Sequence, residues 1–313
     1  MILYILFPQT IDFEEYTMTI KQLQYIVTTA ETGNITAAAG KLFISQPSLT
    51  SAIHEIESEY NITLFHRSKK GIELTPEGDE FLGYARAVLE QTNLMKERYS
   101  GKVQGKKHFS VSSQHYSFAV EAFVSLLKSY GGRQYEFHMR ETQTYEIIED
   151  VAKLRSEIGI LYLNSFNETV IRKTLRDHNL SFTPLFTAKP HVFLGKDSPL
   201  AKKEKISIED LAPYPRLTYE QGGHNSFYFS EEILSTLDCD QEIVVCDRAT
   251  LFNMLVGLNG YTICSGVISE ELNGPHIIAK PLDVDDYMEI GYILPRAIHP
   301  SRLTQSYIKL LER

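Results

Sequence analysis

Apolar positions in the first part of the chain recur at helical spacing. From Thr19 onward, the apolar residues at positions 20, 23, 26, 27 and 30 define one face of an amphipathic helix, and Gly33 is suited to end it. Residues 36–42 are small and alanine-rich, which predicts a short second helix that another helix can approach closely. The spacing therefore predicts two helices here, and a third follows to complete one small core.

The third predicted helix, residues 45–57, has two unlike faces. Leu49, Ile53 and Ile56 form an apolar stripe, while Ser45 is a good N-cap and Pro47 fits the first turn. The opposite face carries amides and hydroxyls that can reach base edges in a major groove. A surface helix pair of any α-helical protein is the alternative, and periodicity alone favours neither. The polar set is Gln46, Ser48, Thr50, Ser51 and His54.

Residues 62–74 predict a two-stranded hairpin, or wing. Apolar residues at positions 62, 64, 65, 72 and 74 flank a cationic cluster of Arg67, Lys69 and Lys70, which lies just before Gly71. Cations on a projecting hairpin can meet backbone phosphates, although such a cluster is more often a solvated turn. Its place directly after two helices joined by a tight turn favours the phosphate-binding interpretation.

A long helix is predicted after Thr75, Pro76 and Glu77, which together are a strong helix start. Its apolar residues alternate at spacings of four and three, the pattern of a helix that pairs with another. We favour dimerisation over packing within the chain. The seam consists of Phe81, Ala85, Val88, Thr92, Met95 and Tyr99.

Beyond a polar hinge at residues 100–107, strands and helices alternate, which indicates an α/β domain. Strands are predicted at 109–113, 135–141, 157–163, 242–246, 261–266, 276–282 and 288–294, with one long strand at 180–195. Helices are predicted at 114–130, 142–156, 208–211, 231–237, 248–258 and 301–313.

Polar side chains follow several of these strands, where open α/β sheets bind small ligands. Free amides and hydroxyls at such junctions suit an anionic or carboxylate-bearing small molecule, and ordinary helix capping is the equal alternative. The candidate residues are Ser112, Ser113, Gln114, His115, Tyr116, Thr218, Gln221, Asp247, Thr250, Ser265 and Gly266.

Composition narrows the class of protein. The 313 residues carry a formal net charge of −9, which argues against a general polyanion binder, so DNA contacts would need local clusters of cations. No apolar run is long enough to span a membrane and no secretory signal is evident, which predicts a cytoplasmic protein. No cofactor or metal motif and no catalytic motif is present, so we expect no enzyme. Among three cysteines, Cys239 and Cys246 are the candidates for a thiol switch, with plain buried cysteine the favoured alternative.

The segment from Asn34 to Gly78 contains SQPSLT, IHEIE, LFHR and LTPEG in that order after an alanine-rich helix. It resembles the LysR-type transcriptional regulators, and weaker similarity in EIGILYL, SPLAKKEKISIEDL and HIIAKPL extends the resemblance to about residue 310. The resemblance implies a winged helix-turn-helix, a long dimerising linker helix and a two-lobed effector domain like the type 2 periplasmic binding proteins. It also implies a homodimer or homotetramer, an interrupted palindrome in promoter DNA, a metabolite between the lobes and RNA polymerase as a candidate partner.

Carried over by position, the resemblance assigns DNA contacts to Thr36, Ser45, Gln46, Pro47, Ser48, Thr50, Ser51, His54, Arg67, Lys69 and Lys70. His54 stands where the family often has Arg or Lys, and Glu157 where it often has Asp. We expect an extension at 1–17, a DNA-binding domain at 18–76, a linker helix and hinge at 77–107 and an effector domain at 108–313. Its lobes are expected at 108–182 with 282–313, and at 183–281.

The leading hypothesis is therefore a DNA-binding transcriptional regulator controlled by a small metabolite. One alternative is a cytosolic small-molecule-binding or catalytic α/β protein whose N-terminal helices merely form a dimer. A thiol redox-sensing regulator is the minor alternative.

Overall fold

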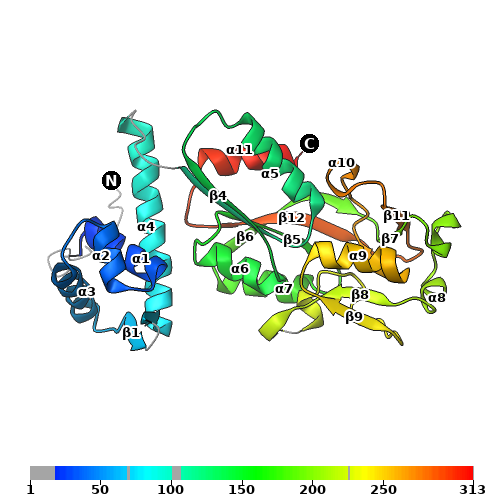
Figure 1. Cartoon of the computed structure of the whole chain (residues 1–313), viewed down its shortest axis with the longest axis horizontal. Coiled ribbons are helices and arrows are strands. Elements are labelled where there is room, and N and C mark those ends of the chain that lie inside the picture. The colour runs from blue at the N-terminus through cyan, green and yellow to red at the C-terminus, as the bar shows by residue number, and fades with distance from the viewer. Residues whose placement is uncertain (1–17, 69–70, 101–106, 225, 313) are drawn as a thin grey trace, which may run out of the picture. The chain divides into compact units, whose positions relative to one another are not determined.

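The computed structural model describes residues 18–68, 71–100, 107–224 and 226–312. The expected extension at 1–17 and most of the hinge lie outside the described residues. The chain divides after Gly101 into two compact units (Figure 1). None of the described helices is long and apolar enough to cross a membrane.

The first unit contains the three predicted helices, the hairpin and the long helix. In chain order these are α1 (Ile20–Thr32), α2 (Ile35–Lys41), α3 (Gln46–Tyr60), β1 (Phe65–Ser68), β2 (Gly71–Leu74) and α4 (Pro76–Ser100). Local sequence fixes the ends: Thr19 and Gln22 form a capping box on α1, and Gly33 ends it with φ +62°.

Close backbone approaches fix the hairpin and α4 against the three helices. The Ile72 amide donates to the Gly33 carbonyl at 3.0 Å. A Cβ on Gly71 would lie 2.4 Å from that carbonyl oxygen, and a Cβ on Gly78 would lie 2.1 Å from the Leu64 carbonyl oxygen. Only glycine fits at these two positions. The core of the unit is apolar and includes Ile26, Ala38, Leu49, Ile56, Leu64 and Leu82.

The second unit is two-lobed, and each lobe is built on a five-stranded mixed sheet. The first sheet has the order β4 (Tyr135–Glu141), β3 (Lys107–Ser113), β5 (Ile158–Leu163), β12 (Met288–Pro295) and β6 (Leu180–Ala188). Helices α5 (Ser117–Ser129) and α11 (Arg302–Leu311) cover one face, and α6 (Thr144–Ala152) and α7 (Glu168–Asp177) cover the other (Figure 1). Strand β5 is buried along its whole length, as its apolar run predicts.

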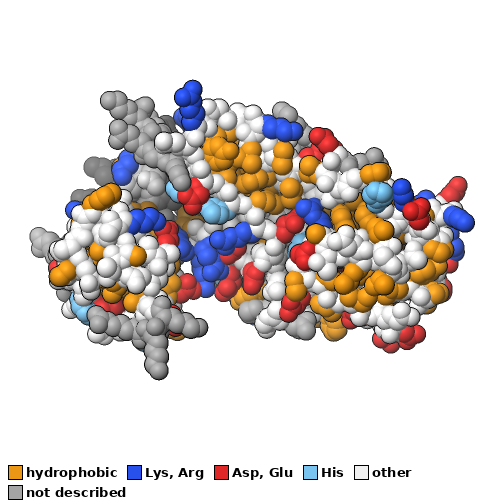
Figure 2. Space-filling view, viewed as in Figure 1, with side chains coloured by type: hydrophobic (Ala, Val, Ile, Leu, Met, Phe, Trp, Pro, Cys, Tyr) orange, Lys and Arg blue, Asp and Glu red, His pale blue; other side chains and the backbone are white. Residues whose placement is uncertain are grey.

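The second sheet has the order β11 (Ile277–Pro281), β7 (His191–Gly195), β10 (Tyr261–Cys264), β8 (Arg216–Tyr219) and β9 (Glu242–Val245). Helix α9 (Arg248–Leu258) packs on it, with short helices α8 (Ile208–Leu211) and α10 (Glu270–Asn273) and 3-10 turns at Pro199–Lys202, Gly222–His224 and Phe227–Phe229. Hydrophobic side chains gather on the surface over α9 and its neighbouring strands (Figure 2), where Val244, Val256 and Leu258 are exposed.

The structure corrects two of the predicted elements. The long strand expected at 180–195 is two strands, because β6 belongs to the first sheet and β7 to the second. The chain thus crosses between lobes at residues 189–190 rather than near 182, and it returns between Pro281 and Met288.

The helix expected at 231–237 is also wrong. These residues form bends and turns, and both Glu231 and Glu232 are buried. Their side chains accept hydrogen bonds from distant residues, so they are not the solvated face of a helix. Helix α7 and strand β8 were not anticipated.

Candidate functional site

Helix α3 presents two different faces. Its apolar stripe of Leu49, Ile53 and Ile56 is buried, as the spacing predicts. The N-terminal end is open, and the Ser45 hydroxyl caps it by accepting from the Ser48 amide at 3.2 Å. The predicted DNA-facing residues that are exposed are Thr36, Ser45, Gln46, Pro47, Ser48, Ser51 and His54.

Several polar side chains of α3 have partners within the unit, and Thr50 and His54 are two of them. The Thr50 hydroxyl donates to the Gln46 carbonyl at 3.0 Å, so it is less free to contact another molecule. His54 Nδ1 lies 3.1 Å from Glu57 Oε2, while Glu57 Oε1 accepts from the Leu64 amide at 2.8 Å. His54 remains 73% exposed, so Glu57 orients an imidazole that still faces solvent.

The predicted hairpin is present, with β1 antiparallel to β2 and Arg67 opposite Ile72. Lys69 and Lys70, which were predicted for its tip, lie outside the described residues, as does the side chain of Arg67. Their contacts with phosphates therefore stay a prediction.

The exposed face of helix α4 coincides only in part with the predicted seam. Ala85 is buried within the first unit, and the Phe81 ring packs edge-on against Tyr60 at 5.6 Å. These two positions therefore belong to the unit's own core. Further along, Val88 and Met95 are exposed and Thr92 is half-buried, while the side chain of Tyr99 is outside the described residues. Tyr84, which was not predicted, is 68% exposed beside Val88.

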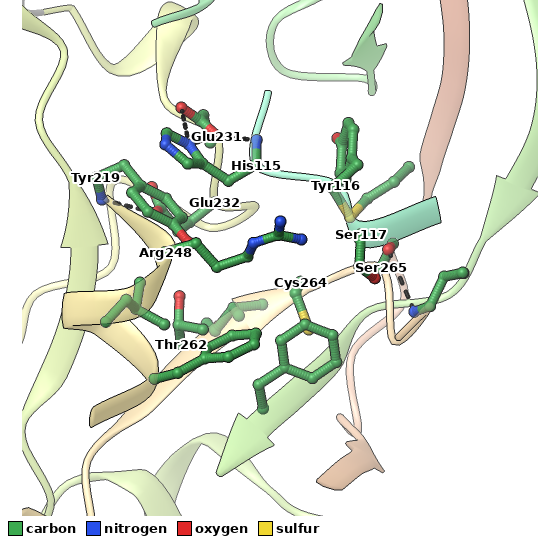
Figure 3. A pocket seen from close by; sticks show the side chains of 16 residues that line it. His115, Tyr116, Ser117, Tyr219, Glu231, Glu232, Arg248, Thr262, Cys264 and Ser265 are labelled. Carbon is green, nitrogen blue, oxygen red and sulfur yellow. Dashed lines mark hydrogen bonds and ion pairs between the residues drawn. The ribbon is translucent and has the colours of Figure 1, made fainter. Parts of the chain in front are cut away.

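Segments from both lobes meet at a narrow pocket (Figure 3). His115 and Tyr116 enter it from the junction of β3 and α5, Tyr219 from the end of β8, and Arg248 from the start of α9. The pocket encloses about 40 Å³ of free volume, enough for a few water molecules. Strand ends and helix starts thus converge where α/β sheets bind ligands.

An irregular stretch, residues 226–235 (the crossing segment), brings second-lobe residues onto the first lobe. Phe229 packs against Tyr145 of α6 with ring centroids 5.4 Å apart. The Tyr162 hydroxyl lies 3.2 Å from the Ser230 carbonyl and 3.3 Å from that of Glu232, and it can donate to either. The crossing segment therefore connects the lobes at the pocket.

His115 and Glu231 form a buried pair across the pocket. His115 Nδ1 lies 3.0 and 2.9 Å from the two Glu231 carboxylate oxygens, and the His115 amide donates to the same carboxylate at 2.9 Å. Burial alone would lower the pKa of His115, but the charge and hydrogen bond of Glu231 outweigh burial and raise it. The pair is therefore ionic over a wider pH range than a free histidine would allow.

Two more carboxyls lie near this pair. Glu141, at the end of β4, is 3.0 Å from Arg248, although burial still raises the pKa of Glu141. Glu232 accepts from the Tyr219 amide at 2.8 Å, and burial together with the charge of Glu231 raises the pKa of Glu232 to about 8. Glu232 is therefore mostly protonated at neutral pH.

A second, larger pocket shares a wall with the first. It holds about 400 Å³ and lies between the crossing segment and the ends of β8 and β9. Tyr219, Glu232 and Ile263 line both pockets. Thr218 and Gln221, both predicted from sequence, line this second pocket.

The remaining predicted effector residues separate into lining and internal positions. His115, Tyr116 and Ser265 line the first pocket. Gly266 has φ +76°, and a Cβ there would lie 2.4 Å from the His191 ring, so it shapes the wall beside Ser265.

The three residues before His115 serve the interior of the first lobe. The Ser112 hydroxyl donates to Asp150 at 2.6 Å, and the Ser113 hydroxyl donates to the Gln114 carbonyl at 2.6 Å. Neither serine lines a described pocket. The Gln114 side chain is likewise buried and accepts from the Tyr162 amide at 3.1 Å.

Asp247 and Thr250 cap a helix, which was the alternative to ligand binding at these positions. Asp247 is the N-cap of α9 and accepts from the Thr250 amide at 2.8 Å and the Thr250 hydroxyl at 2.7 Å. Arg248, one residue further on, is the side chain that enters the pocket. The sequence prediction thus located the correct junction. It named the residues that cap the helix, Asp247 and Thr250, and not Arg248, which lines the pocket.

Sequence reasoning missed the main charged groups of the pocket. Glu231 and Glu232 were expected only as part of a helix, and neither Glu141 nor Arg248 was predicted to line the ligand site. A pair of adjacent acids before an apolar residue is common on surface helices, so the local sequence carried no signal of burial. His115 and Glu231 are 116 positions apart, and only the fold brings them together.

The cysteines do not form a reactive pair in the described part of the chain, where all three are free. A hydrogen bond to Glu220 raises the pKa of the Cys246 thiol, and burial raises that of Cys264. Neither environment favours the thiolate that a redox switch needs. Within the described ranges, His, Cys, Asp and Glu form no group suited to hold a metal ion.

Comparison with known proteins agrees with this architecture. Residues 20–79 match the sequence model of the bacterial regulatory helix-turn-helix proteins of the lysR family, and residues 111–313 match that of the LysR substrate binding domain. The chain belongs to the LysR family: it is a DNA-binding transcriptional regulator with a substrate-binding effector domain.

Individual relatives are similar over different lengths. The transcriptional regulator AlsR of Bacillus subtilis (strain 168) is 27% identical over 246 residues, 77% of each chain. TfdS of Cupriavidus pinatubonensis is 49% identical over 73 residues, 23% of this chain and 25% of TfdS. A full-length OxyR variant from Pseudomonas aeruginosa shares the fold with TM-score 0.68 and 21% identity, over 95% of this chain and 98% of that one. CbnR complexed with its target DNA has TM-score 0.57 and 18% identity, over 95% and 99%.

Proposed function

We propose that the protein binds a promoter sequence in the cytoplasm through α3 and the wing, and that a small molecule bound between the lobes of its effector domain controls this binding. The observation that carries the proposal is the division of α3 into a buried apolar stripe and an open N-terminal end. Gln46 and Ser48 project from that end with side chains able to read base edges. The proposed DNA contacts are Thr36, Ser45, Gln46, Pro47, Ser48, Thr50, Ser51 and His54, with Arg67, Lys69 and Lys70 on the wing.

We infer that the working form is a homodimer or homotetramer. The first unit has no excess of basic residues, so one copy has little sequence-independent affinity and two copies would share the task. The exposed face of α4 (Tyr84, Val88 and Met95) and the apolar surface over α9 support self-association. A regulator bound beside a promoter would act on RNA polymerase.

The pocket between the lobes is the proposed control site. His115, Tyr219, Glu231 and Arg248 meet there from four separate segments, so a ligand at this place would touch both lobes. Because the free volume is only about 40 Å³, a ligand larger than a few waters would have to change the spacing of the lobes or extend into the adjoining pocket. Such a change is a direct route from ligand to DNA binding.

The test of DNA binding uses the full chain and a matched pair of variants. Purified protein is mixed with sheared chromosomal DNA, and the bound fragments are sequenced with and without a metabolite extract. We expect a few sites to be enriched near promoters by the wild type and by Glu204→Gln, whose side chain is exposed in the second unit. Gln46→Ala should lose the enrichment. Equal recovery of all fragments by the three proteins would contradict the proposal.

A further inference from the structure

We propose that the 400 Å³ pocket beside the cleft binds a small organic cation, and that Glu232 is the residue that pairs with its charge. The expected ligand carries a primary ammonium or guanidinium group on an uncharged body. This deepens the proposed function by naming the chemical class of its effector, and only the consequence for DNA rests on that function. It replaces the carboxylate-bearing ligand that the strand-end residues first suggested.

The pocket is built around the end of β8. The Tyr219 amide donates to Glu232 at 2.8 Å, and the Tyr219 carbonyl accepts from the Gln221 amide group at 3.3 Å. Two side chains from different segments thus hydrogen-bond the backbone of one residue, Tyr219, and line the same pocket. Both are more than nine-tenths buried, so their positions are fixed by packing and are not those of mobile surface groups.

Among the described residues around the pocket, one buried carboxyl is left without a cation. Glu231 is paired with His115, and Glu242 with Arg216 at 2.7 Å. Glu220, also in the pocket wall, accepts from the Cys246 thiol at 3.0 Å. In the described part of the chain, Glu232 forms no ion pair, and its side chain accepts hydrogen bonds from backbone amides alone, that of Tyr219 foremost. A buried carboxyl of this kind requires a proton or a cation.

Gln221 gives a second, independent indication. Its side-chain oxygen is buried and has no hydrogen-bond partner among the residues that the structure describes. A buried acceptor without a donor is costly, and a ligand N–H would satisfy it. An anion would leave the Gln221 oxygen without a donor and would be repelled by Glu220 in the pocket wall. Tyr219 and Phe227 contribute aromatic rings to the same pocket, and such rings also favour a cation.

Cation binding here exchanges a proton for the ligand. The pKa of Glu232 is raised to about 8 by burial and by Glu231, so at neutral pH the carboxyl enters the reaction protonated and the ligand enters as a cation. On binding, the carboxyl O–H bond breaks, the proton goes to buffer and the carboxylate pairs with the cation. The groups that act electrostatically on Glu232 or respond to it are Glu231, Arg216, Tyr116, Tyr162, Tyr219 and Cys264.

The test is calorimetry of the full chain without DNA, using benzylammonium and its matched anion benzoate as probes at millimolar concentration. We expect benzylammonium to bind and to release about one proton at pH 7, measured in two buffers of different ionisation enthalpy. Benzoate should bind at least about tenfold more weakly. Glu232→Gln keeps the shape and the acceptor for the Tyr219 amide while removing the charge, so it should fold as the wild type does.

Two variants test whether Glu232 pairs with the charge of the ligand. Glu232→Gln should weaken benzylammonium binding about tenfold or more and abolish proton release, whereas Glu204→Gln on the surface of the same lobe should change neither. Absence of benzylammonium binding, binding of benzoate as tight as that of benzylammonium, or equal binding by the two variants would overturn the proposal. If the DNA-binding proposal proved wrong, this result would still stand, because the calorimeter contains no DNA.

Discussion

The imidazole of His115 and the ring of Tyr219 stack face to face, with centroids 3.8 Å apart and planes 3° apart. One ring comes from the β3–α5 junction of the first lobe and the other from the end of β8 in the second. Glu231 fixes the imidazole edge at 2.9 Å. The two lobes are thus joined at the pocket by a stack and an ion pair that share one side chain.

His115→Ala should destabilise the effector unit by about 3 kcal/mol, because it removes the stack and leaves Glu231 buried without its cation. Urea unfolding of the full chain, followed by tyrosine fluorescence, measures the change. His299→Ala is the control, since that side chain is exposed, and it should lie within about 0.5 kcal/mol of the wild type. Equal stability of the two variants would show that the stack and the ion pair do not stabilise the effector unit.

Stability should fall as pH rises from 5 to 8 in a manner that depends on Glu232. The folded carboxyl has a pKa of about 8, against 4.5 for the free group, so in this window the folded state holds a proton that the unfolded state has lost. The contribution of Glu232 is therefore full below pH 4.5 and is lost as pH rises through 8, by at most about 1.4 kcal/mol per pH unit. In Glu232→Gln the urea midpoint should depend less on pH. A slope that matches the wild type would contradict a raised pKa.

Changes in α3 and in the wing should affect DNA binding differently. Gln46→Ala removes a base-reading side chain and should lower the preference for the specific site by about 1–3 kcal/mol. Lys70→Ala removes one phosphate contact, so it should weaken binding to all duplexes alike and reduce the salt slope by about 1. Fluorescence anisotropy with a specific and a scrambled duplex over a range of salt separates the two. If both variants behaved alike, α3 would not be the reading helix.

On α4, two substitutions should have separate consequences. Met95→Glu places a charge on the exposed face and should shift the protein toward a folded monomer in sedimentation velocity. Phe81→Ala removes a ring that packs on Tyr60, so it should destabilise the first unit by about 3 kcal/mol and leave assembly of the folded protein intact. A monomer produced by Phe81→Ala but not by Met95→Glu would contradict a role of the exposed face of α4 in assembly.

Local periodicity sufficed for the three short helices of the first unit. The burial of Leu49, Ile53 and Ile56 follows from their spacing on one helix, and the caps at Thr19 and Ser45 need only neighbouring residues. The same reasoning failed where burial depends on distant segments. Ala85 matches a heptad position, but the fold of its own unit covers it.

The candidate site depends on such distant contacts even more. Strand-end positions located His115 and Thr218 because α/β topology places ligands there. Glu231 and Glu232 have no local signature, since their burial comes from a turn that crosses between lobes. The charge of the pocket, and hence the class of ligand it favours, therefore required the structure.

The proposed regulator reads a DNA sequence through α3. The decisive experiment is selection of binding sites from a library of random duplexes by the purified full chain, with Gln46→Ala in parallel. We predict that the wild type enriches an interrupted inverted repeat and that the variant loses the preferred bases while retaining weak general binding. Recovery of no common sequence by the wild type, with and without a small organic cation present, would contradict the claim.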